Sequence, residues 1–187
     1  METKQGYNRI MNKNEILGKA KNIKLLACDV DGVLTRGEII IFNNSEEVKI
    51  WNVKDGMGYN LLSRTSPRIK TAWITGRGSL QVEARATEMK IDYLIQNCAS
   101  KKQAIETIAQ KENLDLSQIA YIGDDIIDIP VLKVVGLSSC PADACFDAKE
   151  VVSFVSSING GEGIVREMIE IIMKSLDQWK KIWETYE

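Results

Sequence analysis

The sequence predicts a single α/β domain, Rossmann-like, with a central parallel sheet flanked by helices and a small β-hairpin insertion. Short apolar runs alternate along the chain with helix-like segments of ten or so residues, the pattern of βαβ units. The run that ends at Asp29 is apolar almost without interruption, which is typical of a parallel strand buried on both faces. Several runs end in polar residues, and open α/β sheets bind their ligands beyond the carboxyl ends of the strands.

The first half of the chain begins with a polar lead-in over residues 1–21, which carries a short helix near 14–20, and the main domain then spans 22–187. Two β-rich runs within 38–51 surround an Asn-rich loop and predict a hairpin. An isolated hairpin is marginal in water, so we expect this Ile-rich one to pack against something, such as a second subunit. The other elements expected here are a strand over 23–29, a helix over 55–64 capped by Asp55 with Leu61 and Leu62 facing inward, and a strand over 70–74.

Ser79 and Ser100 are candidate N-caps of two further helices, one ending at Met89 and the other near Lys111. In the first of these helices, Leu80, Val82, Ala86 and Met89 are the apolar positions. Strands are expected at 92–95 and 119–122, and weaker ones at 135–137 and 151–155. A glycine-rich segment, 160–163, precedes a final helix that runs to about Trp183, within a tail of about 159–187.

Composition and charge narrow the function classes. The chain has 187 residues, of which 44% are hydrophobic and 27% charged, as in an ordinary globular domain. A net charge of −2 argues against broad nucleic-acid binding, which needs uncompensated Lys and Arg. The sequence shows neither a membrane-spanning run nor the apolar core of a signal peptide, so a cytoplasmic protein without membrane contact is expected.

The sequence contains no histidine, and its four cysteines lack zinc-ligand spacing. Nucleophile pairs of the Ser-His and Cys-His type, phosphohistidine chemistry and His-ligated zinc are therefore excluded. Any catalysis must use carboxylates, lysine and hydroxyl groups, with or without a metal ion.

Three of the predicted strands end in residues that suit such chemistry: Asp29 and Asp31, then Thr75, then the group Asp124, Asp125 and Asp128. These residues are expected to meet at one edge of the sheet with Lys101, which begins a helix. Neighbouring carboxylates repel each other unless a cation holds them ionised. Oxygen ligands without His or Cys favour Mg²⁺, which commonly bridges carboxylates to a substrate phosphate.

The roles follow from phosphoryl-transfer chemistry. Asp29 is the candidate nucleophile, and Asp31 the general acid and then general base. Thr75 and Lys101 would bind the transferring phosphoryl oxygens. Asp124 would ligate the metal, with Asp125 and Asp128 in support.

Simpler interpretations compete with these roles. Thr75 with the following glycine is an ordinary turn, Lys101 an ordinary solvated helix start, and Asp128 an ordinary helix cap. A calcium-binding EF-hand beginning at Asp29 fails, because positions 33, 34 and 40 carry Val, Leu and Ile where the loop needs an oxygen ligand, Gly and Glu.

The motifs 29–35, Thr75-Gly76-Arg77, Lys101 and 123–128 resemble, in this order, the four motifs of the haloacid dehalogenase superfamily. The small hairpin points to its capless phosphatases. The segments 49–58, 74–77, 121–130 and 160–167 are similar, more narrowly, to phosphatases of 3-deoxy-D-manno-octulosonate 8-phosphate, an intermediate of lipopolysaccharide biosynthesis. The resemblance implies a homotetramer in which hairpins associate and neighbouring subunits cap each other's sites.

The resemblance also implies residue roles. Asp29 is the nucleophile, Asp31 the acid and base as well as a metal ligand through its carbonyl, and Asp124 a metal ligand; the implied metal set is thus Asp29, Asp31 and Asp124 for Mg²⁺. A phosphorylated sugar acid would be the substrate. The residues implied or expected to contact it are Asn52, Val53, Lys54, Asp55, Gly56, Arg77, Arg85, Asp128 and Arg166, the last in its own or a neighbour's site.

Departures from the family pattern keep alternatives open. Lys54 stands where the family usually has Arg, the family's second basic residue is missing near Asn60, and two extra residues lie around 65–68. A phosphatase of nonulosonate 9-phosphates is the nearest competitor, although an acidic residue would be expected there at position 77. A non-catalytic oligomeric binding subunit is a second alternative. A phosphotransferase or mutase would need a larger cap to exclude water.

Overall fold

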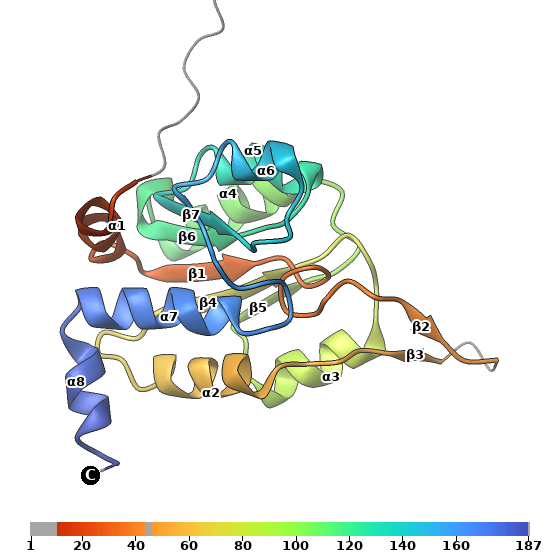
Figure 1. The fold of residues 1–187 in the computed structure, drawn as a ribbon, viewed down its shortest axis with the longest axis horizontal. Coiled ribbons are helices and arrows are strands. Elements are labelled where there is room, and N and C mark those ends of the chain that lie inside the picture. Colours follow the sequence, from red (N-terminus) through yellow and green to blue (C-terminus); the bar gives the residue numbers. More distant parts are fainter. Residues whose placement is uncertain (1–10, 44–45, 187) are drawn as a thin grey trace, which may run out of the picture.

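Strand β1 (Leu25–Cys28) lies near the centre of a six-stranded parallel sheet in the computed structural model, which describes residues 11–43 and 46–186 (Figure 1). The strand order is β5-β4-β1-β6-β7-β8. The chain therefore adds β4 and β5 on one side of β1 and then β6, β7 and β8 on the other. Cys28 is opposite Trp73 of β4 and Ile122 of β6, and these three strands therefore end within one residue of one another. The predicted α/β fold with a parallel sheet is confirmed.

The remaining elements alternate as expected. The sheet strands besides β1 are β4 (Lys70–Ile74), β5 (Tyr93–Ile95), β6 (Ile119–Ile122), β7 (Leu137–Cys140) and β8 (Phe154–Val155). The helices are α1 (Lys13–Ala20), α2 (Val53–Leu62), α3 (Leu80–Glu88), α4 (Lys101–Glu112), α5 (Ile129–Leu132), α6 (Phe146–Lys149), α7 (Ile164–Ser175) and α8 (Gln178–Trp183), with short 3-10 turns η1 (Leu116–Gln118) and η2 (Ile126–Asp128).

Alternate side chains of β1 pack into two separate cores. Leu26 and Cys28 belong to the core that α1, α2, α3 and α7 cover, and Leu25 and Ala27 to the core that α4, α5 and α6 cover. Figure 1 shows α2, α3 and α7 on one side of the sheet and α4, α5 and α6 on the other. All four residues are fully buried, which explains why the sequence of this strand is continuously apolar.

Helix α2 begins two residues before the predicted start. The side chain of Asn52 caps it by accepting the backbone N–H of Lys54 at 2.9 Å. The prediction that Asp55 is the N-cap is wrong, because Asp55 lies inside the first turn and its carboxylate accepts the N–H of Arg166 at 2.8 Å. Leu61 and Leu62 are buried, as expected.

Other boundaries differ from the predicted ones. Ser79 stands at the N-cap of α3 without a capping hydrogen bond, and Leu80 is 78% exposed instead of packed inward. Strand β7 is shifted toward the C-terminus because Leu137 pairs in register with Ala120. The final helix is two helices, since Asp177 adopts a left-handed conformation between α7 and α8. Helix α1 packs on α7 with Ala20 buried, so residues 13–20 pack as part of the domain.

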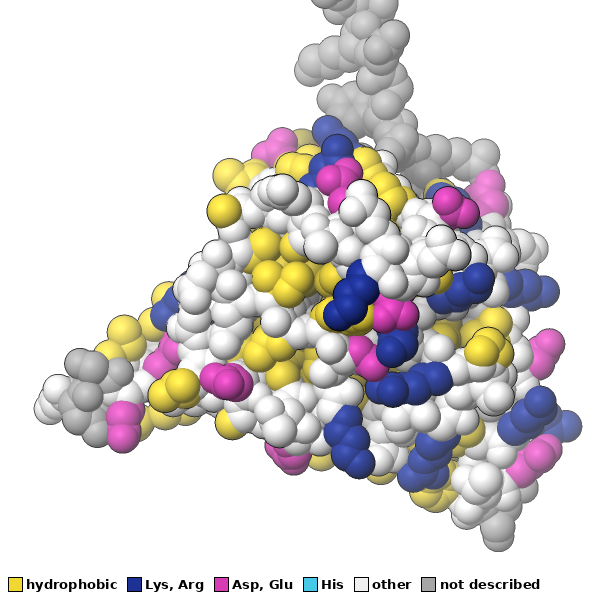
Figure 2. Space-filling model, turned by 180° about the vertical axis from the view of Figure 1, so that it is seen from behind, with side chains coloured by type: hydrophobic (Ala, Val, Ile, Leu, Met, Phe, Trp, Pro, Cys, Tyr) yellow, Lys and Arg dark blue, Asp and Glu magenta, His cyan; other side chains and the backbone are white. Residues whose placement is uncertain are grey.

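The hairpin of β2 (Ile40–Ile41) and β3 (Glu47–Val48) projects from one side of the domain (Figure 1). Residues 44 and 45 of its predicted loop lie outside the described part of the chain, as do residues 1–10 of the lead-in. Ile39, Ile41 and Phe42 are more than half exposed on the hairpin. Figure 2 shows hydrophobic side chains along this projecting arm. Among the helices described, none combines the length and apolar character that crossing a membrane requires.

Candidate active site

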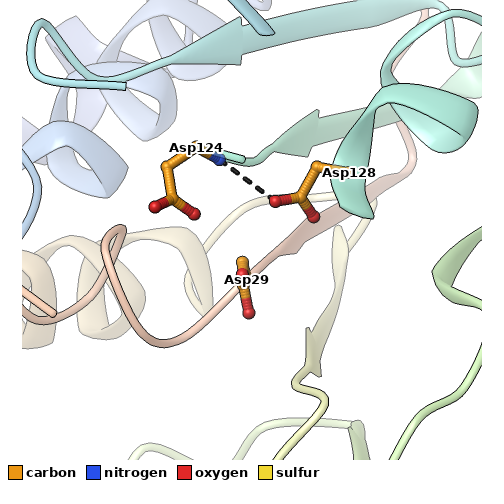
Figure 3. A group of neighbouring side chains, drawn as sticks. All are labelled: Asp29, Asp124 and Asp128. Carbon is orange, nitrogen blue, oxygen red and sulfur yellow. Dashed lines mark hydrogen bonds between the residues drawn. The ribbon is translucent and has the colours of Figure 1, made fainter. Parts of the chain in front are cut away.

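Three carboxylates meet where β1 and β6 end. Asp29 directly follows β1, and Asp124 and Asp128 follow β6; their nearest oxygen atoms all lie within 4.8 Å of one another (Figure 3). Asp29 and Asp124 thus come together from two neighbouring strands, as the sequence pattern predicts. Such a group is suited to holding a cation or to transferring a proton.

Glycine at position 32 allows this close approach. Its φ of +87° is a backbone conformation that other residues rarely adopt, and a β-carbon there would overlap the Asp124 carboxylate. The glycine after Asp31 therefore has a structural reason besides ending the strand.

Lys101, the first residue of α4, supplies the central positive charge. Its Nζ lies 2.5 Å from Oδ2 of Asp29 and 2.7 Å from Oδ1 of Asp128, and the residue is only 4% exposed. Ser100 caps the helix by accepting the N–H of Gln103. The simpler interpretation of Lys101 as a solvated helix start is wrong.

Asp128 holds the other groups in place. It has no exposed surface, and besides Lys101 it accepts the hydroxyl of Tyr121 at 2.7 Å and the N–H groups of Asp124 and Asp125 at 3.1 and 3.3 Å. This burial argues against the predicted contact with substrate, so a supporting role is the better interpretation. Asp125 caps the short turn η2 by accepting the N–H of Ile126.

The carboxylates are poised to bind a cation. Burial, with the charge of Asp128, raises the pKa of Asp29 to about 6, although Lys101 opposes the shift. Burial, with the charges of Asp29 and Asp128, raises the pKa of Asp124 to about 8. Oδ1 of Asp124 is buried without a hydrogen-bond partner in the described part of the chain. An all-oxygen site with an unpaired buried acceptor fits Mg²⁺.

The side chain of Asp31 lies outside this group of carboxylates. Its Oδ1 pairs with Nζ of Lys49, which follows β3 in the hairpin. The three carboxylates that lie together are those of Asp29, Asp124 and Asp128. The metal set implied by the resemblance differs from this group in one member, because it has Asp31 in place of Asp128. The implied ligand from Asp31 is its carbonyl, and that role stays a prediction.

Thr75 and Arg77 follow β4 at the same edge of the sheet. Thr75 is buried, and its Oγ1 accepts the N–H of Arg77 at 3.2 Å. Nη2 of Arg77 lies 3.0 Å from Oε1 of Glu47 in β3. Arg77 is thus placed between the sheet edge and the hairpin.

The predicted substrate-binding segment 52–56 divides into two parts. Asn52, Gly56 and Arg85 line one small pocket, and Nδ2 of Asn52 donates to the carbonyl of Gly161 at 3.0 Å. Asp55 also lines this pocket, but it is only 3% exposed and its Oδ1 is bound to the N-terminus of α7, which argues against contact with substrate. Val53 and Lys54 are exposed.

Arg166 is engaged within its own subunit. Its Nε lies 2.9 Å from Glu170, and its guanidinium stacks over the ring of Trp179 in α8. This arrangement turns Arg166 toward α8 instead of bringing it into the carboxylate group.

Sequence reasoning missed Glu47, Lys49 and Tyr121 as parts of the site. Glu47 and Lys49 are two residues apart in an extended segment and so project to the same side, which is a signal that the sequence carries. The sequence does not predict the hydrogen bond of Tyr121 to Asp128, because Tyr121 is indistinguishable there from the apolar residues of a buried strand.

Comparisons with known proteins agree with this geometry. Residues 70–168 match the haloacid dehalogenase-like hydrolase family. A 3-deoxy-D-manno-octulosonate 8-phosphate phosphatase of Yersinia pestis is 39% identical over 165 residues, 88% of this chain and 87% of that protein. The corresponding protein of Escherichia coli K12 is 40% identical over 85% of this chain and 84% of its own length.

Solved structures are equally similar. The crystal structure of the Yersinia pestis phosphatase superposes with a TM-score of 0.86 over 89% of both chains. That of the Moraxella catarrhalis 3-deoxy-D-manno-octulosonate 8-phosphate phosphatase, in complex with magnesium, phosphate and the KDO molecule, superposes with a TM-score of 0.90 at 36% identity, covering 94% of this chain and all of that one. The chain belongs to the haloacid dehalogenase-like hydrolases and, within them, to the family of the 3-deoxy-D-manno-octulosonate 8-phosphate phosphatases.

Proposed function

We propose that this protein hydrolyses 3-deoxy-D-manno-octulosonate 8-phosphate to the free sugar acid and phosphate, with Mg²⁺, as a step of lipopolysaccharide biosynthesis. The observation that carries the proposal is the contact of Asp29 with Lys101 beside Asp124, at the carboxyl edge of β1 and β6. A carboxylate beside a buried cation and a cation-binding group has what an aspartyl-phosphate mechanism needs.

In the first step, a carboxylate oxygen of Asp29 attacks phosphorus, and the bond between phosphorus and the sugar oxygen breaks. Asp31 donates its proton to that oxygen, so the sugar leaves as an alcohol. The ammonium group of Lys101 and the hydroxyl of Thr75 bind phosphoryl oxygens. Asp128 keeps Lys101 in position, since it binds the same Nζ at 2.7 Å.

In the second step, water attacks the phosphorus of the aspartyl-phosphate and gives its proton to Asp31. Phosphate leaves, and Asp29 regains its carboxylate. Asp29, Asp124 and the carbonyl of Asp31 would hold Mg²⁺, which when bound neutralises charge on the phosphoryl group.

Recognition of the sugar acid is proposed for the basic residues around the hairpin and α2. The planar fork of Arg77 suits a substrate carboxylate. Asn52, Gly56 and Arg85 line a pocket suited to polar groups of the sugar, and Lys54 is exposed beside the glycine-rich segment. We assign Asp55, Asp128 and Arg166 to supporting positions within the subunit, an assignment supported by their contacts there.

A screen of eight- and nine-carbon keto-acid phosphates and neutral sugar phosphates, with and without Mg²⁺, tests the proposal. We expect release of phosphate from the eight-carbon substrate in the presence of Mg²⁺, and loss of turnover in Asp29→Asn. Turnover retained by Asp29→Asn contradicts the covalent mechanism. A preference for a nonulosonate 9-phosphate or a neutral sugar contradicts the substrate, and no release from any of them supports a non-catalytic subunit.

We further propose a cytoplasmic homotetramer in which hairpins associate. The exposed Ile41 and Phe42, at 63% and 53%, support a protein contact there, and the four free cysteines suit a reducing compartment. Light scattering of Ile41→Glu should show dissociation, while Lys102→Glu on exposed α4 surface should leave the assembly intact. A monomeric wild-type protein contradicts the proposal.

A further inference from the structure

Lys49 brings the hairpin into contact with the proposed acid and base. Its Nζ pairs with Oδ1 of Asp31, although the two residues are 18 positions apart in the sequence. The Lys49 side chain is 2% exposed, while the Asp31 side chain remains 24% exposed. Lys49 is therefore a buried cation whose carboxylate partner is open to a ligand.

A second carboxylate keeps Lys49 in place. Oε1 of Glu47 lies 3.3 Å from Nζ of Lys49 and 3.0 Å from Nη2 of Arg77. Asp31, Lys49, Glu47 and Arg77 thus form a row of alternating charges, which we call the hairpin charge row. It joins the acid and base at one end to the proposed carboxylate-binding Arg77 at the other.

Burying Lys49 within this row costs free energy. Removing a lysine from water carries a desolvation penalty that its ion pairs often fail to recover, so a buried ion pair is weak evidence for a role in stability. A role in function therefore explains the hairpin charge row better than a role in stability does. The hydrogen bond from Lys49 uses Oδ1 of Asp31, and Oδ2 is the oxygen that remains for the proton.

We propose that Lys49 is a positioning residue that fixes the Asp31 carboxyl group in the orientation for proton transfer, with Glu47 holding Lys49. This inference rests on the proposed function, because it assigns a purpose to the acid and base of that reaction. Asp31 lies in the loop after β1, outside the strand itself, so a contact from another element is needed to fix its side chain.

Substrates with different leaving groups distinguish a role of Lys49 in positioning Asp31 from a role in binding the substrate or the phosphoryl group. The sugar leaves as an alkoxide and needs the proton of Asp31, whereas p-nitrophenolate is a stable anion and needs none. Formation of the aspartyl-phosphate from p-nitrophenyl phosphate should therefore bypass Asp31, while its hydrolysis by water still requires Asp31 as base. A burst of p-nitrophenolate followed by slow turnover is the expected signature of a misplaced Asp31.

The experiment compares wild type, Lys49→Met, Lys49→Arg and the surface control Lys102→Met, with Asp31→Asn as reference, in the Mg²⁺-loaded full-length protein. For Lys49→Met we expect kcat on the sugar acid phosphate to fall about 100-fold with KM changed less than about threefold, the scale of lost acid–base catalysis. With p-nitrophenyl phosphate, the rate of the first p-nitrophenolate release, measured in a single turnover, should stay near that of wild type, and steady-state turnover should fall. Lys49→Arg should recover most of kcat, and Lys102→Met should match wild type.

Each other result overturns the inference. An unchanged kcat shows that Asp31 needs no help from Lys49, and a rise in KM alone makes Lys49 a substrate-binding residue. A burst slowed as much as turnover places Lys49 at the phosphoryl group. The burst amplitude counts correctly folded sites, so kcat per active site remains measurable if Lys49→Met folds poorly. A wild-type enzyme that releases phosphate from neither the sugar acid phosphate nor p-nitrophenyl phosphate contradicts the proposed function instead.

Discussion

The Nζ atom of Lys101 lies 2.5 Å from Oδ2 of Asp29, and both side chains are buried. The contact brings the first residue of α4 to the end of β1, across 72 positions of sequence. Burial alone would lower the pKa of Lys101, but Asp128 and Asp29 outweigh it and raise the pKa, so this lysine is a cation in the site.

Replacing Lys101 should damage both activity and stability. In Lys101→Met, Asp29 and Asp128 lose the buried cation between them, and we expect kcat to fall about 10²- to 10³-fold. Breaking a buried pair should also cost about 3–5 kcal/mol in the free energy of unfolding. Phosphate release and urea denaturation measure the two effects. Lys102→Met removes the adjacent lysine, whose side chain is 42% exposed, and a loss of similar size there would refute the assignment.

Gly32→Ala should weaken metal binding. The added β-carbon would overlap the Asp124 carboxylate, and alanine is strained at a φ of +87° by about 1–3 kcal/mol. We expect lower Mg²⁺ affinity by calorimetry together with a lower melting temperature. Gly18→Ala in α1 is the matched control, since a β-carbon there meets nothing within 4 Å and alanine favours a helix. Equal Mg²⁺ affinity in wild type and Gly32→Ala would contradict the steric argument.

Mg²⁺ affinity should increase with pH. With its pKa raised to about 8, Asp124 carries a proton near neutral pH that a bound cation must displace. We therefore expect the apparent affinity to rise about tenfold per pH unit from 6 to 8 and to level off above 8. Titration calorimetry in buffers of different ionisation enthalpy should detect about one proton released per ion. An affinity constant across this range would show that no proton competes.

Asp55 should make the fold less stable as pH rises. Burial is the largest cause of its pKa, about 6 in the folded protein against 3.8 ordinarily, although backbone N–H groups of α7 oppose the shift. The neutral carboxyl is therefore favoured on folding: this contribution is full below pH 3.8 and is lost as pH rises through 6.

Asp55→Asn measures the effect, because the amide oxygen can still accept from α7. Relative to wild type, the variant should gain about 2 kcal/mol of unfolding free energy between pH 4 and 7, from the pKa difference. Urea denaturation at both pH values provides the measurement. Asp147→Asn, which changes an exposed carboxylate, should show little gain; a gain there as large as in Asp55→Asn would mean that the effect is not specific to burial.

Much of the sheet, and the meeting of Asp29, Asp124 and Asp128 at its edge, could be predicted from local patterns. The continuous apolar run of β1 and the acidic residues that follow β1 and β6 require only that parallel strands end at a common edge. The absence of histidine could also be read directly from the sequence, and it excluded every mechanism that needs a histidine base, nucleophile or metal ligand. Cap positions were harder, as Asn52 and Asp55 show, because either side chain can cap a helix and the choice depends on which one a neighbouring helix engages.

The partners of each charge were beyond the reach of local pattern. No local pattern near Asp31 predicts its contact with Lys49, and none near Asp55 predicts its hydrogen bond with the amide of Arg166. Both contacts join segments that are distant in the sequence. Burial is likewise a property of the whole packed chain, and it is burial that raises the pKa values of Asp29 and Asp124 and places Asp128 out of reach of substrate. The types and spacing of the residues were enough to predict the chemistry that this site can perform. The roles of the individual carboxylates depended on which of them the folded chain buries.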